Sequence, residues 1–281
     1  MSSAVFNGAR VWVVIPALNE APSVGLVVEE LRSLTNAAGG PVVDHIVVCD
    51  NNSSDDTAAV AQDAGAAVVT ETQQGYGAAC LRALALVRSA RAREDDVVLF
   101  VDADRSVEVS EVPALLAPLA EGADLVIGNR VAGAQERGAL TPQQRFGNWL
   151  ASALIRRLWR CDVNDLGPFR AIRAGALERL HMQDRAFGWT CEMQIRAIQR
   201  GLSVVEVPVS SLKRIGQSKI SGTLLGSLRA GQGILGMVAQ RKWREWQERR
   251  QRTLEARTRG RFRPTPTARR CRSGRYRSSH R

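Results

Sequence analysis

The sequence predicts an α/β fold with a mostly parallel sheet and helices on both faces. Over the first 130 residues, short apolar runs alternate with helix-length segments, which is typical of parallel strands joined by crossover helices. Residues 97–101 are continuously apolar and mostly β-branched, as expected for a strand that is buried on both faces. This run leads directly into Asp102 and Asp104. Open α/β sheets bind ligands at the carboxyl ends of their strands, so we expect a site at this edge.

The remaining elements follow from apolar periodicity and from breakers. The expected strands cover residues 11–15, 45–49, 66–70, 97–101, 124–127 and 203–209, with Pro16 stopping the first and Pro208 favouring an edge position for the last. The expected helices cover residues 22–34, 78–91, 110–120, 145–160, 190–200 and 222–239, and a further helix follows the polar cluster 50–57 and ends at Gly65. Residues 128–130 are expected to form a turn, and residues 131–140 a mobile loop.

The positive charge of the chain is concentrated at its end. Residues 241–281 hold 16 Lys and Arg against 3 acidic residues, a net charge of +13, which leaves −2 for residues 1–240. We therefore expect one folded domain over residues 1–240, followed by an Arg-rich tail that is disordered after at most a few helical turns.

The cysteines and the apolar runs of the sequence indicate the cellular compartment. The five cysteines are scattered without a CxxC pair, which is typical of a reduced protein rather than of a disulfide framework or zinc site. Residues 1–14 contain no apolar core of signal-peptide length, and no run of about 18 apolar residues occurs. We expect a cytoplasmic protein without a transmembrane helix.

Asp102 and Asp104 would point to the same side of an extended strand, because alternate side chains share a face. Two adjacent carboxylates repel each other unless a positive charge lies beside them. A hard divalent cation takes oxygen ligands and keeps positions open for phosphate, so the pair predicts a metal–diphosphate site. The simpler alternative is a pair of solvated turn residues that close the strand.

Several short segments, taken together, resemble a known family. In chain order they are residues 16–20, Asp50 with Ser53 and residues 56–57, Gly75 and Gly77, residues 102–104 and residues 128–130. Their order and spacing resemble the family 2 glycosyltransferases of the GT-A fold. Segments 165–170, 189–194, 206–209 and 214–219 are similar to the polyprenyl (dolichyl) phosphate mannose and glucose synthase branch. The resemblance covers about residues 10–235 and implies a GT-A (Rossmann-like) domain over residues 1–240, with a nucleotide-sugar half at about 10–130 and an acceptor half at about 131–240.

The resemblance implies a role for each matching residue. Nucleotide-sugar-binding residues would be Pro16, Asn19, Glu20, Asp50, Gly75, Asp102 and Arg130, and Asp102 with Asp104 would hold Mg²⁺ or Mn²⁺. Catalytic residues would be Asp104, Arg214, Lys219 and Glu192, and the acceptor phosphate would be bound by Asp165, Arg170 and Ser218. Simpler interpretations stay open: a helix cap for Asn19, surface charges for Arg130, Arg214 and Lys219, a turn for Asp165, and a first-turn acid for Glu192.

One motif departs from this branch, where a Gln two residues after the second Asp often completes the metal shell. Here Arg105 and Ser106 follow Asp104. Ser106 is a weaker ligand, and Arg105 could instead contribute its charge.

The resemblance implies an inverting transfer of glucose or mannose from a UDP-glucose or GDP-mannose type of donor to a polyprenyl phosphate. A phosphate monoester is largely ionised near pH 7 and needs no general base. A soluble or other lipid hydroxyl acceptor is the alternative, and it would need a base such as Asp165 or Glu192.

The Arg-rich tail would attract an anionic membrane surface and hold the enzyme peripherally on the inner face of the membrane. A nucleic-acid-binding protein ranks lower, because only the tail favours it and no nucleic-acid motif occurs elsewhere.

Residues 145–160 form an amphipathic helix. Its apolar stripe consists of Phe146, Trp149, Leu150, Ala153, Leu154 and Leu158, and it is flanked by arginines. We expect the stripe to pack into the core, as most such stripes do. The alternative is a helix that lies in a bilayer interface.

Overall fold

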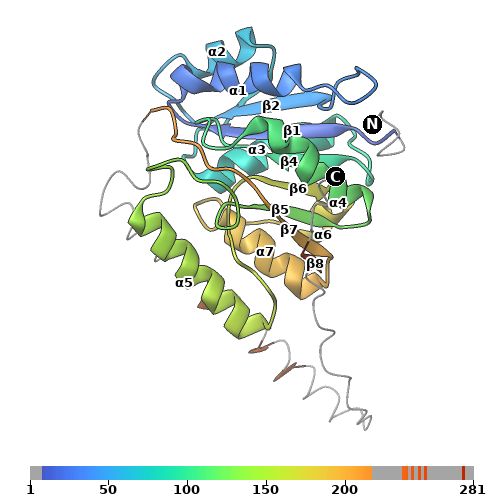
Figure 1. Ribbon diagram of the computed structural model, residues 1–281, viewed down its shortest axis with the longest axis vertical. Helices are drawn as coiled ribbons and strands as arrows, with labels where there is room; N and C mark the ends of the chain where they lie inside the picture. Colours follow the sequence, from blue (N-terminus) through green and yellow to red (C-terminus); the bar gives the residue numbers. More distant parts are fainter. Residues whose placement is uncertain are drawn as a thin grey trace.

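The computed structural model describes residues 8–216, 236–239, 242–243, 246–247, 250–251 and 274–275. Its strands are β1 (Val11–Ala17), β2 (His45–Asp50), β3 (Ala67–Thr70), β4 (Val97–Phe100), β5 (Leu125–Asn129), β6 (Arg170–Arg173), β7 (Val204–Pro208) and β8 (Gly274–Arg275). They form one sheet in the order β3-β2-β1-β4-β6-β5-β7-β8 (Figure 1). Among these strands, β6 runs antiparallel to β4 and β5, and the other pairs are parallel. The expected mostly parallel α/β sheet is confirmed.

Helices cover both faces of this sheet. They are α1 (Ala21–Ser33), α2 (Thr57–Asp63), α3 (Tyr76–Ser89), η2 (Val109–Glu111), α4 (Val112–Ala120), α5 (Pro142–Trp159), α6 (Ala174–Leu180) and α7 (Trp189–Arg200). Residues of α1, α2 and α4 share one hydrophobic cluster, and residues of α3, α6 and α7 share a second cluster. The α5 helix packs against α7 through a third cluster, at the side of the molecule seen in Figure 1.

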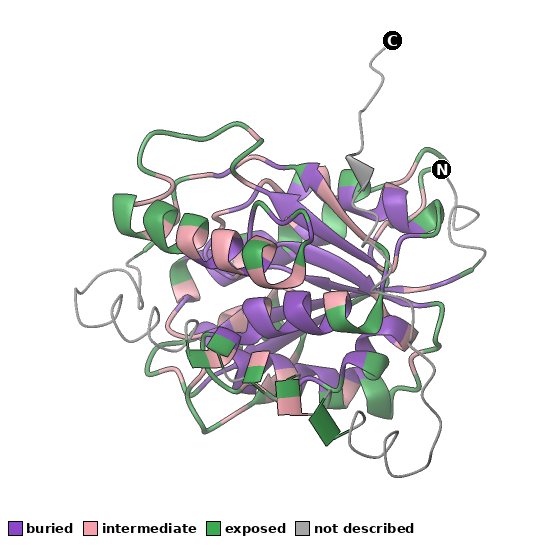
Figure 2. Cartoon of the chain, turned by 90° about the horizontal axis from the view of Figure 1, so that it is seen from below, coloured by how far each residue is buried: buried purple, intermediate pink, exposed green. Residues whose placement is uncertain are grey.

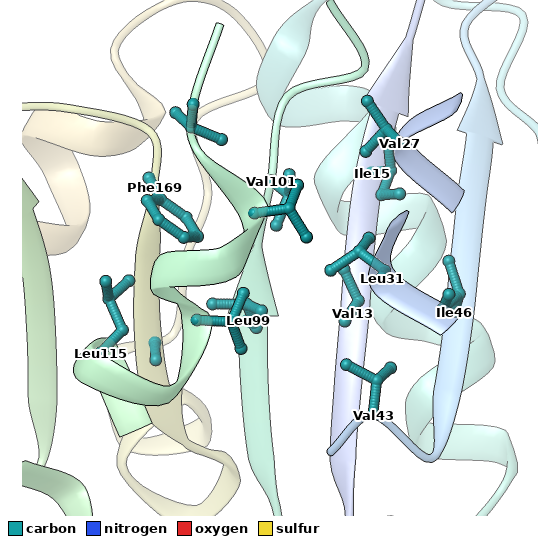
Figure 3. Packing of buried hydrophobic residues seen from close by; sticks show 14 of the residues in the cluster. Val13, Ile15, Val27, Leu31, Val43, Ile46, Leu99, Val101, Leu115 and Phe169 are labelled. Carbon is teal, nitrogen blue, oxygen red and sulfur yellow. The ribbon is translucent and has the colours of Figure 1, made fainter. Parts of the chain in front are cut away.

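The strands alternate their side chains between the two main clusters. In β1, Val13 and Ile15 enter the first cluster, whereas Trp12 and Val14 enter the second. Figure 3 shows the first cluster, in which Leu31 of α1 packs against this face of the sheet and Leu99 projects from β4 on the same face. The strands β1, β2, β4 and β5 are therefore buried along nearly their whole length (Figure 2), which explains why their sequences are almost continuously apolar. β3 and β7 are only partly buried.

Several boundaries differ from the sequence prediction, among them those of β1, β5 and α4. β1 continues through Pro16 to Ala17, because the amide that proline lacks would face β4, which has already ended at Phe100. Gly128 and Asn129 belong to β5 rather than to a turn, and they pair with Val207 and Pro208. The helix expected at residues 110–120 begins as the 3₁₀ turn η2 and becomes α4 at Val112.

The stripe of α5 does not pack into the core as one unit. Ala151 and Ile155 are buried, but Phe146 and Trp149 are 62% and 59% exposed. Their rings contact each other, with centroids 5.9 Å apart. Core packing was therefore the wrong expectation for these two aromatic residues.

The described parts of the C-terminal region are short. Residues 236–239, 242–243, 246–247 and 250–251 are helical, and Val238 packs against α5 and α7. Gly274 and Arg275 pair with β7, a strand that the sequence did not predict in the tail, so β7 is not the outermost strand. Residues 222–235 of the last expected helix lie outside the described residues. In the described part of the chain, no helix has the length and apolar character to cross a bilayer.

Candidate active site

Polar residues lie at the carboxyl ends of four strands, of which β2, β1 and β4 are neighbours and β5 is separated from β4 by β6. Glu20 follows β1, Asp50 ends β2, Asp102 follows β4, and Arg130 follows β5. In the parallel register Ala17 pairs with Asp50, and β4 lies on the other side of β1, so these ends meet at one edge of the sheet. The edge is where the sequence placed the site.

Asp102 and Asp104 lie just beyond β4, in the turn that leaves the sheet, and not within the extended strand. The hydroxyl of Tyr76, at the start of α3, donates to Asp102 Oδ1 over 3.1 Å. Burial and the negative charge of Asp104 raise the pKa of Asp102, while Tyr76, Arg130 and Arg214 oppose that rise. The two carboxylates therefore interact, and their surroundings favour an additional positive charge.

Arg214 pairs with one member of this acidic pair, Asp104, and with Glu20. Its Nη2 atom is 2.5 Å from Asp104 Oδ2 and 3.6 Å from Glu20 Oε1. Its Nε atom is buried and has no hydrogen-bond partner. The loop that bears Arg214 is hydrogen-bonded to the Asp104 turn, since Ile215 N donates to Asp104 O.

Arg130, which follows β5, forms a largely buried ion pair with Asp165. Its Nε and Nη2 atoms donate to the two carboxylate oxygens over 2.9 and 2.7 Å, and its backbone amide donates over 2.7 Å. Burial alone would lower the pKa of Arg130, but Asp165, with smaller contributions from Asp102 and Asp104, raises it. Arg130 therefore stays charged, held by Asp165 and within the electric field of Asp102 and Asp104.

Asp50 and Asn19 surround the end of β2. Asp50 is buried, and its Oδ1 atom accepts a hydrogen bond from Ser53 N. Asn19 Oδ1 accepts from Ser54 N over 2.7 Å, and Glu20, not Asn19, is the residue that precedes α1. The open alternative of a helix cap for Asn19 is wrong, because Asn19 supports the loop after β2.

Gly75 serves chain packing. It has φ +153°, and a Cβ atom there would lie 2.1 Å from Arg185 O. Its amide donates to Asn51 Oδ1. The close approach of its backbone to residues 184–186 requires glycine here, and its role in nucleotide-sugar binding stays a prediction.

Arg170 and Glu192 are enclosed by protein. Arg170 is fully buried and donates to the carbonyl oxygens of Gly167 and Thr190, and burial lowers its pKa to about 10. Glu192 accepts from the amides of Gln183 and Asp184 and pairs with Arg196 at 2.8 Å. Both side chains hold the fold together, so direct contact of Arg170 with an acceptor, or of Glu192 with a reacting group, disagrees with this geometry.

The two motif residues that follow Asp104 differ in their contacts. Arg105 pairs with Glu30 of α1 at 2.6 Å, so its charge goes to that helix. Ser106 N donates to Asp104 Oδ1 over 3.0 Å and orients this carboxylate. Ser218 and Lys219 lie outside the described residues.

With this geometry in place, comparison with known proteins identifies the family. Residues 12–180 match the family model described as Glycosyl transferase family 2. The chain belongs to glycosyltransferase family 2. It is an enzyme of the GT-A type that uses a nucleotide-sugar, and the resemblance predicted from the motifs is confirmed.

Relatives of this family 2 glycosyltransferase differ in their acceptors. An uncharacterised glycosyltransferase of Mycobacterium tuberculosis is 38% identical over 224 residues, covering 79% of this chain and 94% of that protein. The undecaprenyl-phosphate mannosyltransferase of Micrococcus luteus is 28% identical, covering 77% and 90%. A crystal structure of glucosyl-3-phosphoglycerate synthase from M. tuberculosis with Mn²⁺, UDP and glucosyl-3-phosphoglycerate superposes with a TM-score of 0.65 at 25% identity, covering 85% of this chain and 82% of that one.

The oxygen ligands of the glycosyltransferase site fit a metal ion that takes some of its ligands from the protein and the others from a substrate. Within the described residues, no group of three or more His, Cys, Asp or Glu is arranged to hold an ion. Asp102 and Asp104 supply carboxylate oxygens, which Mg²⁺ and Mn²⁺ accept while they take further ligands from phosphates and water. The raised pKa of Asp102 agrees with a site that gains from one more cation.

Sequence reasoning missed three residues that organise the glycosyltransferase site. Tyr76 holds Asp102, and Asn51 joins the β2 end to Glu71 O and Gln73 O. Glu206 of β7 binds Asn129 and the amide of Asn164, which positions the Asp165 loop. A polar residue within an otherwise apolar strand was the available signal for Glu206. A cavity of about 280 Å³ between α3 and α6 contains no predicted site residue.

Proposed function

We propose that this glycosyltransferase transfers glucose or mannose, with inversion and with a divalent metal, from a nucleotide-sugar to a polyprenyl-phosphate-type acceptor. The observation that carries this proposal is the Asp102–Asp104 pair beyond β4, with the guanidinium groups of Arg130 and Arg214 beside it. Carboxylates bind a diphosphate through a metal, and guanidinium groups bind it directly in a bidentate manner. Lys219 and Ser218 are further candidates for phosphate contacts from the sequence.

The nucleoside of the donor is assigned to the ends of β1 and β2. Asp50 is buried at the last position of β2, and Asn19 fixes the following loop. Acids at strand ends bind ribose hydroxyls in other nucleotide-binding sheets. We assign Asp50 and Glu20 to the nucleoside, with Pro16 and Gly75 shaping the backbone around it, and UDP-glucose or GDP-mannose as the donor type.

Bound by Asp102 and Asp104, Mg²⁺ or Mn²⁺ would act as a Lewis acid that neutralises negative charge on the departing diphosphate. Tyr76 fixes one oxygen of Asp102, and Ser106 N fixes one oxygen of Asp104, so both carboxylates are oriented before a ligand arrives. Arg130 is held by Asp165 and contributes a fixed positive charge. Such preorganised charge is the main means by which sites stabilise a charged leaving group.

The burial and ion pairing of the two candidate bases support a phosphate acceptor. Asp165 is fully buried and bound by three donors of Arg130, and Glu192 is 1% exposed and bound by Arg196. Neither carboxylate is placed to take a proton from an acceptor hydroxyl. A phosphate oxygen is already ionised near pH 7 and can attack the anomeric carbon without a base.

Membrane association would place the enzyme beside a polyprenyl phosphate. The outward face of α5 combines the exposed rings of Phe146 and Trp149 with exposed Arg145 and Arg157. Residues 142–160 contain no acidic residue. Aromatic rings with arginines suit the headgroup region of an anionic bilayer, and the tail would add about 1 kcal/mol for each basic residue near the surface.

Vesicle co-sedimentation tests this association. Phe146→Ser with Trp149→Ser should reduce binding to vesicles that contain an anionic lipid by about tenfold. Leu26→Ser is the matched control, since Leu26 is an exposed apolar residue on α1, at 45% exposure, and should bind as the parent does. Equal binding of both variants would remove α5 from the proposal.

The activity is tested first by binding and then by transfer. Thermal shift with UDP, GDP and their sugars, each with and without Mn²⁺, should show stabilisation by one nucleotide that depends on the metal. With the matching labelled sugar-nucleotide, label should move into organic-extractable polyprenyl phosphate. Asp104→Asn should slow transfer by at least about 100-fold, and Asp95→Asn, at the opposite end of β4, should leave it unchanged. Undiminished transfer by Asp104→Asn would overturn the metal assignment.

A soluble acceptor is the second candidate, favoured by the likeness to a synthase crystallised with glucosyl-3-phosphoglycerate. Label that moves to 3-phosphoglycerate and stays in the aqueous phase would establish this candidate and exclude the lipid acceptor. Nucleic-acid binding through the tail is the remaining alternative. It would appear as RNA retention that is lost when tail arginines are replaced by glutamine, with transfer unaffected.

A further inference from the structure

The Arg214 guanidinium group lies beside the carboxylates of Asp104 and Glu20, where its positive charge offsets their negative charges. Its Nη2 atom lies 2.5 Å from Asp104 Oδ2 and 3.6 Å from Glu20 Oε1. The other oxygen of Asp104, Oδ1, accepts a hydrogen bond from Ser106 N over 3.0 Å. Both oxygens of Asp104 therefore already have partners, and an incoming metal ion can reach Oδ2 only if the guanidinium moves.

The backbone around Arg214 is fixed independently of this ion pair. Leu212 N donates to Ser106 O and Ile215 N donates to Asp104 O, over 2.9 and 3.0 Å. Lys213 N donates to Glu136 Oε2 over 2.6 Å. Since these bonds involve only backbone atoms of the loop, the long side chain of Arg214 can leave Asp104 without unfolding the loop.

The present position of Arg214 leaves one of its donors unused. The Nε atom is buried and has no hydrogen-bond partner. A buried donor without a partner is destabilising, because it has lost its hydrogen bonds to water. A diphosphate presents two oxygens that can accept from Nε and Nη2 together, in the bidentate geometry that guanidinium groups favour. The side chain therefore has a better partner in the donor than it has in Asp104.

We propose that Arg214 is a tethered counter-ion that competes with the divalent metal for Asp104, and that it makes metal binding depend on the nucleotide diphosphate. In the donor-free enzyme the guanidinium neutralises Asp104 and keeps free metal out. When a diphosphate arrives, Arg214 transfers to the phosphate and releases Asp104 Oδ2. This inference rests on the proposed function, and it assigns Arg214 the control of binding order in addition to a phosphate contact.

The competition predicts a coupling between metal and nucleotide. If UDP or GDP removes Arg214 from Asp104, it must raise the affinity for Mn²⁺, and Mn²⁺ must raise the affinity for the nucleotide by the same factor. Coupling factors of this kind are typically about 5–150-fold. Removing the guanidinium should abolish much of this coupling and should raise the nucleotide-free affinity for Mn²⁺.

The experiment measures Mn²⁺ binding by electron paramagnetic resonance of the free ion, with no sugar transfer involved. Without nucleotide, Arg214→Gln should bind Mn²⁺ at least about fivefold more tightly than the parent protein. Arg105→Gln is the matched control, because it removes the same charge one residue from Asp104 while its guanidinium pairs with Glu30. It should bind Mn²⁺ as the parent does. Adding Asp104→Asn to Arg214→Gln should remove the gain.

The outcomes separate this inference from the proposed function. If the parent protein binds Mn²⁺ neither alone nor with UDP or GDP, the metal-dependent function itself is wrong. If it binds Mn²⁺ with nucleotide but Arg214→Gln gains nothing over the parent, or gains no more than Arg105→Gln, the counter-ion role is overturned. Should Arg214→Gln fail to fold, the parent alone decides, because equal Mn²⁺ affinities with and without nucleotide would also contradict the proposal.

Discussion

Asp96 and Asp104 flank the same strand, and their surroundings give the two carboxylates different roles. Asp96 is fully buried and accepts from the backbone and guanidinium of Arg10, from Arg93 N and from Trp12 Nε1. Asp104 has one backbone donor and one side chain that can leave. A carboxylate with every lone pair satisfied by its own chain stabilises the fold, whereas one with a replaceable partner is available to a ligand.

Asp96 should therefore contribute to stability in a pH-dependent way. Burial alone would raise its pKa, but the bonds from Arg10 and Arg93 lower it to about 2. A lowered folded-state pKa stabilises the protein above the unfolded value near 4, and this contribution disappears as pH falls toward 2. By urea unfolding at pH 7, Asp96→Asn should lower the free energy of unfolding by about 2 kcal/mol. Asp95→Asn, at an exposed side chain, should change little. A difference between Asp96→Asn and the parent that persists unchanged at pH 2 would contradict this.

Glu192 illustrates how a candidate base becomes a structural residue. It is 1% exposed, pairs with Arg196 one helical turn later, and caps the amides of Gln183 and Asp184. Breaking a buried ion pair costs about 3–5 kcal/mol. Glu192→Gln should lower the melting temperature while kcat, measured well below that temperature, falls by less than about tenfold. A large loss of kcat at an unchanged melting temperature would instead restore Glu192 as a catalytic residue.

At the scale of elements, the start of α3 is built around residues 184–186. The amides of Gly77 and Ala78, which the helix leaves unpaired, donate to Ala186 O and Arg185 O over 3.0 Å. A Cβ atom on Gly77 would lie 2.0 Å from Asp184 O. Glu192 of α7 accepts a hydrogen bond from the amide of Asp184, in the same segment. Residues 184–186 therefore join α7 to the start of α3, where Tyr76 contacts Asp102.

Gly77→Ala should therefore destabilise the protein by about 1–3 kcal/mol, as overpacking does. It should also weaken nucleotide binding, since Tyr76 precedes the displaced residue. Gly147→Ala is the control: Gly147 is likewise in a helix, α5, but a Cβ atom there meets nothing within 4 Å. Alanine at that position should be neutral or stabilising. Differential scanning calorimetry of the two variants compares these expectations, and equal melting temperatures would show that the 184–186 contact is not a constraint.

The packing of Gly75 and Gly77 against residues 184–186 is an example of what the sequence could not predict. The strands and the Asp102–Asp104 pair were predictable because apolar runs and the acids that end them are local in the chain. The contact of Gly75 with Arg185 was not predictable, because Arg185 lies 110 residues further along the chain and no local pattern indicates it. The exposure of Phe146 and Trp149 was equally hidden, since periodicity defines an apolar face but not whether another element covers it.

At the scale of the whole molecule, the two expected halves share one sheet. β6, from the acceptor half, lies between β4 and β5 of the nucleotide half, and β7 pairs with β5 on its other side. Phe169 and Ala171 of the acceptor half belong to the same hydrophobic cluster as Val13 and Leu99. The halves at residues 10–130 and 131–240 therefore share the two main clusters, while the third cluster lies within the acceptor half. Because the sheet is common to both halves, we expect them to unfold as one unit.

The buried cysteines can report this cooperativity. Cys49 and Cys80 lie in the first half and Cys161 and Cys191 in the second, and all four are buried. Burial raises the pKa of Cys49 and of Cys191 to about 12, so neither thiol reacts in the native state. In a Cys271→Ser variant, pulsed alkylation at increasing urea, followed by peptide mass spectrometry, should show all four cysteines becoming reactive at one urea concentration. Labelling of Cys161 and Cys191 at lower urea than Cys49 and Cys80 would mean that the acceptor half opens on its own, and that the shared sheet is divided at β6.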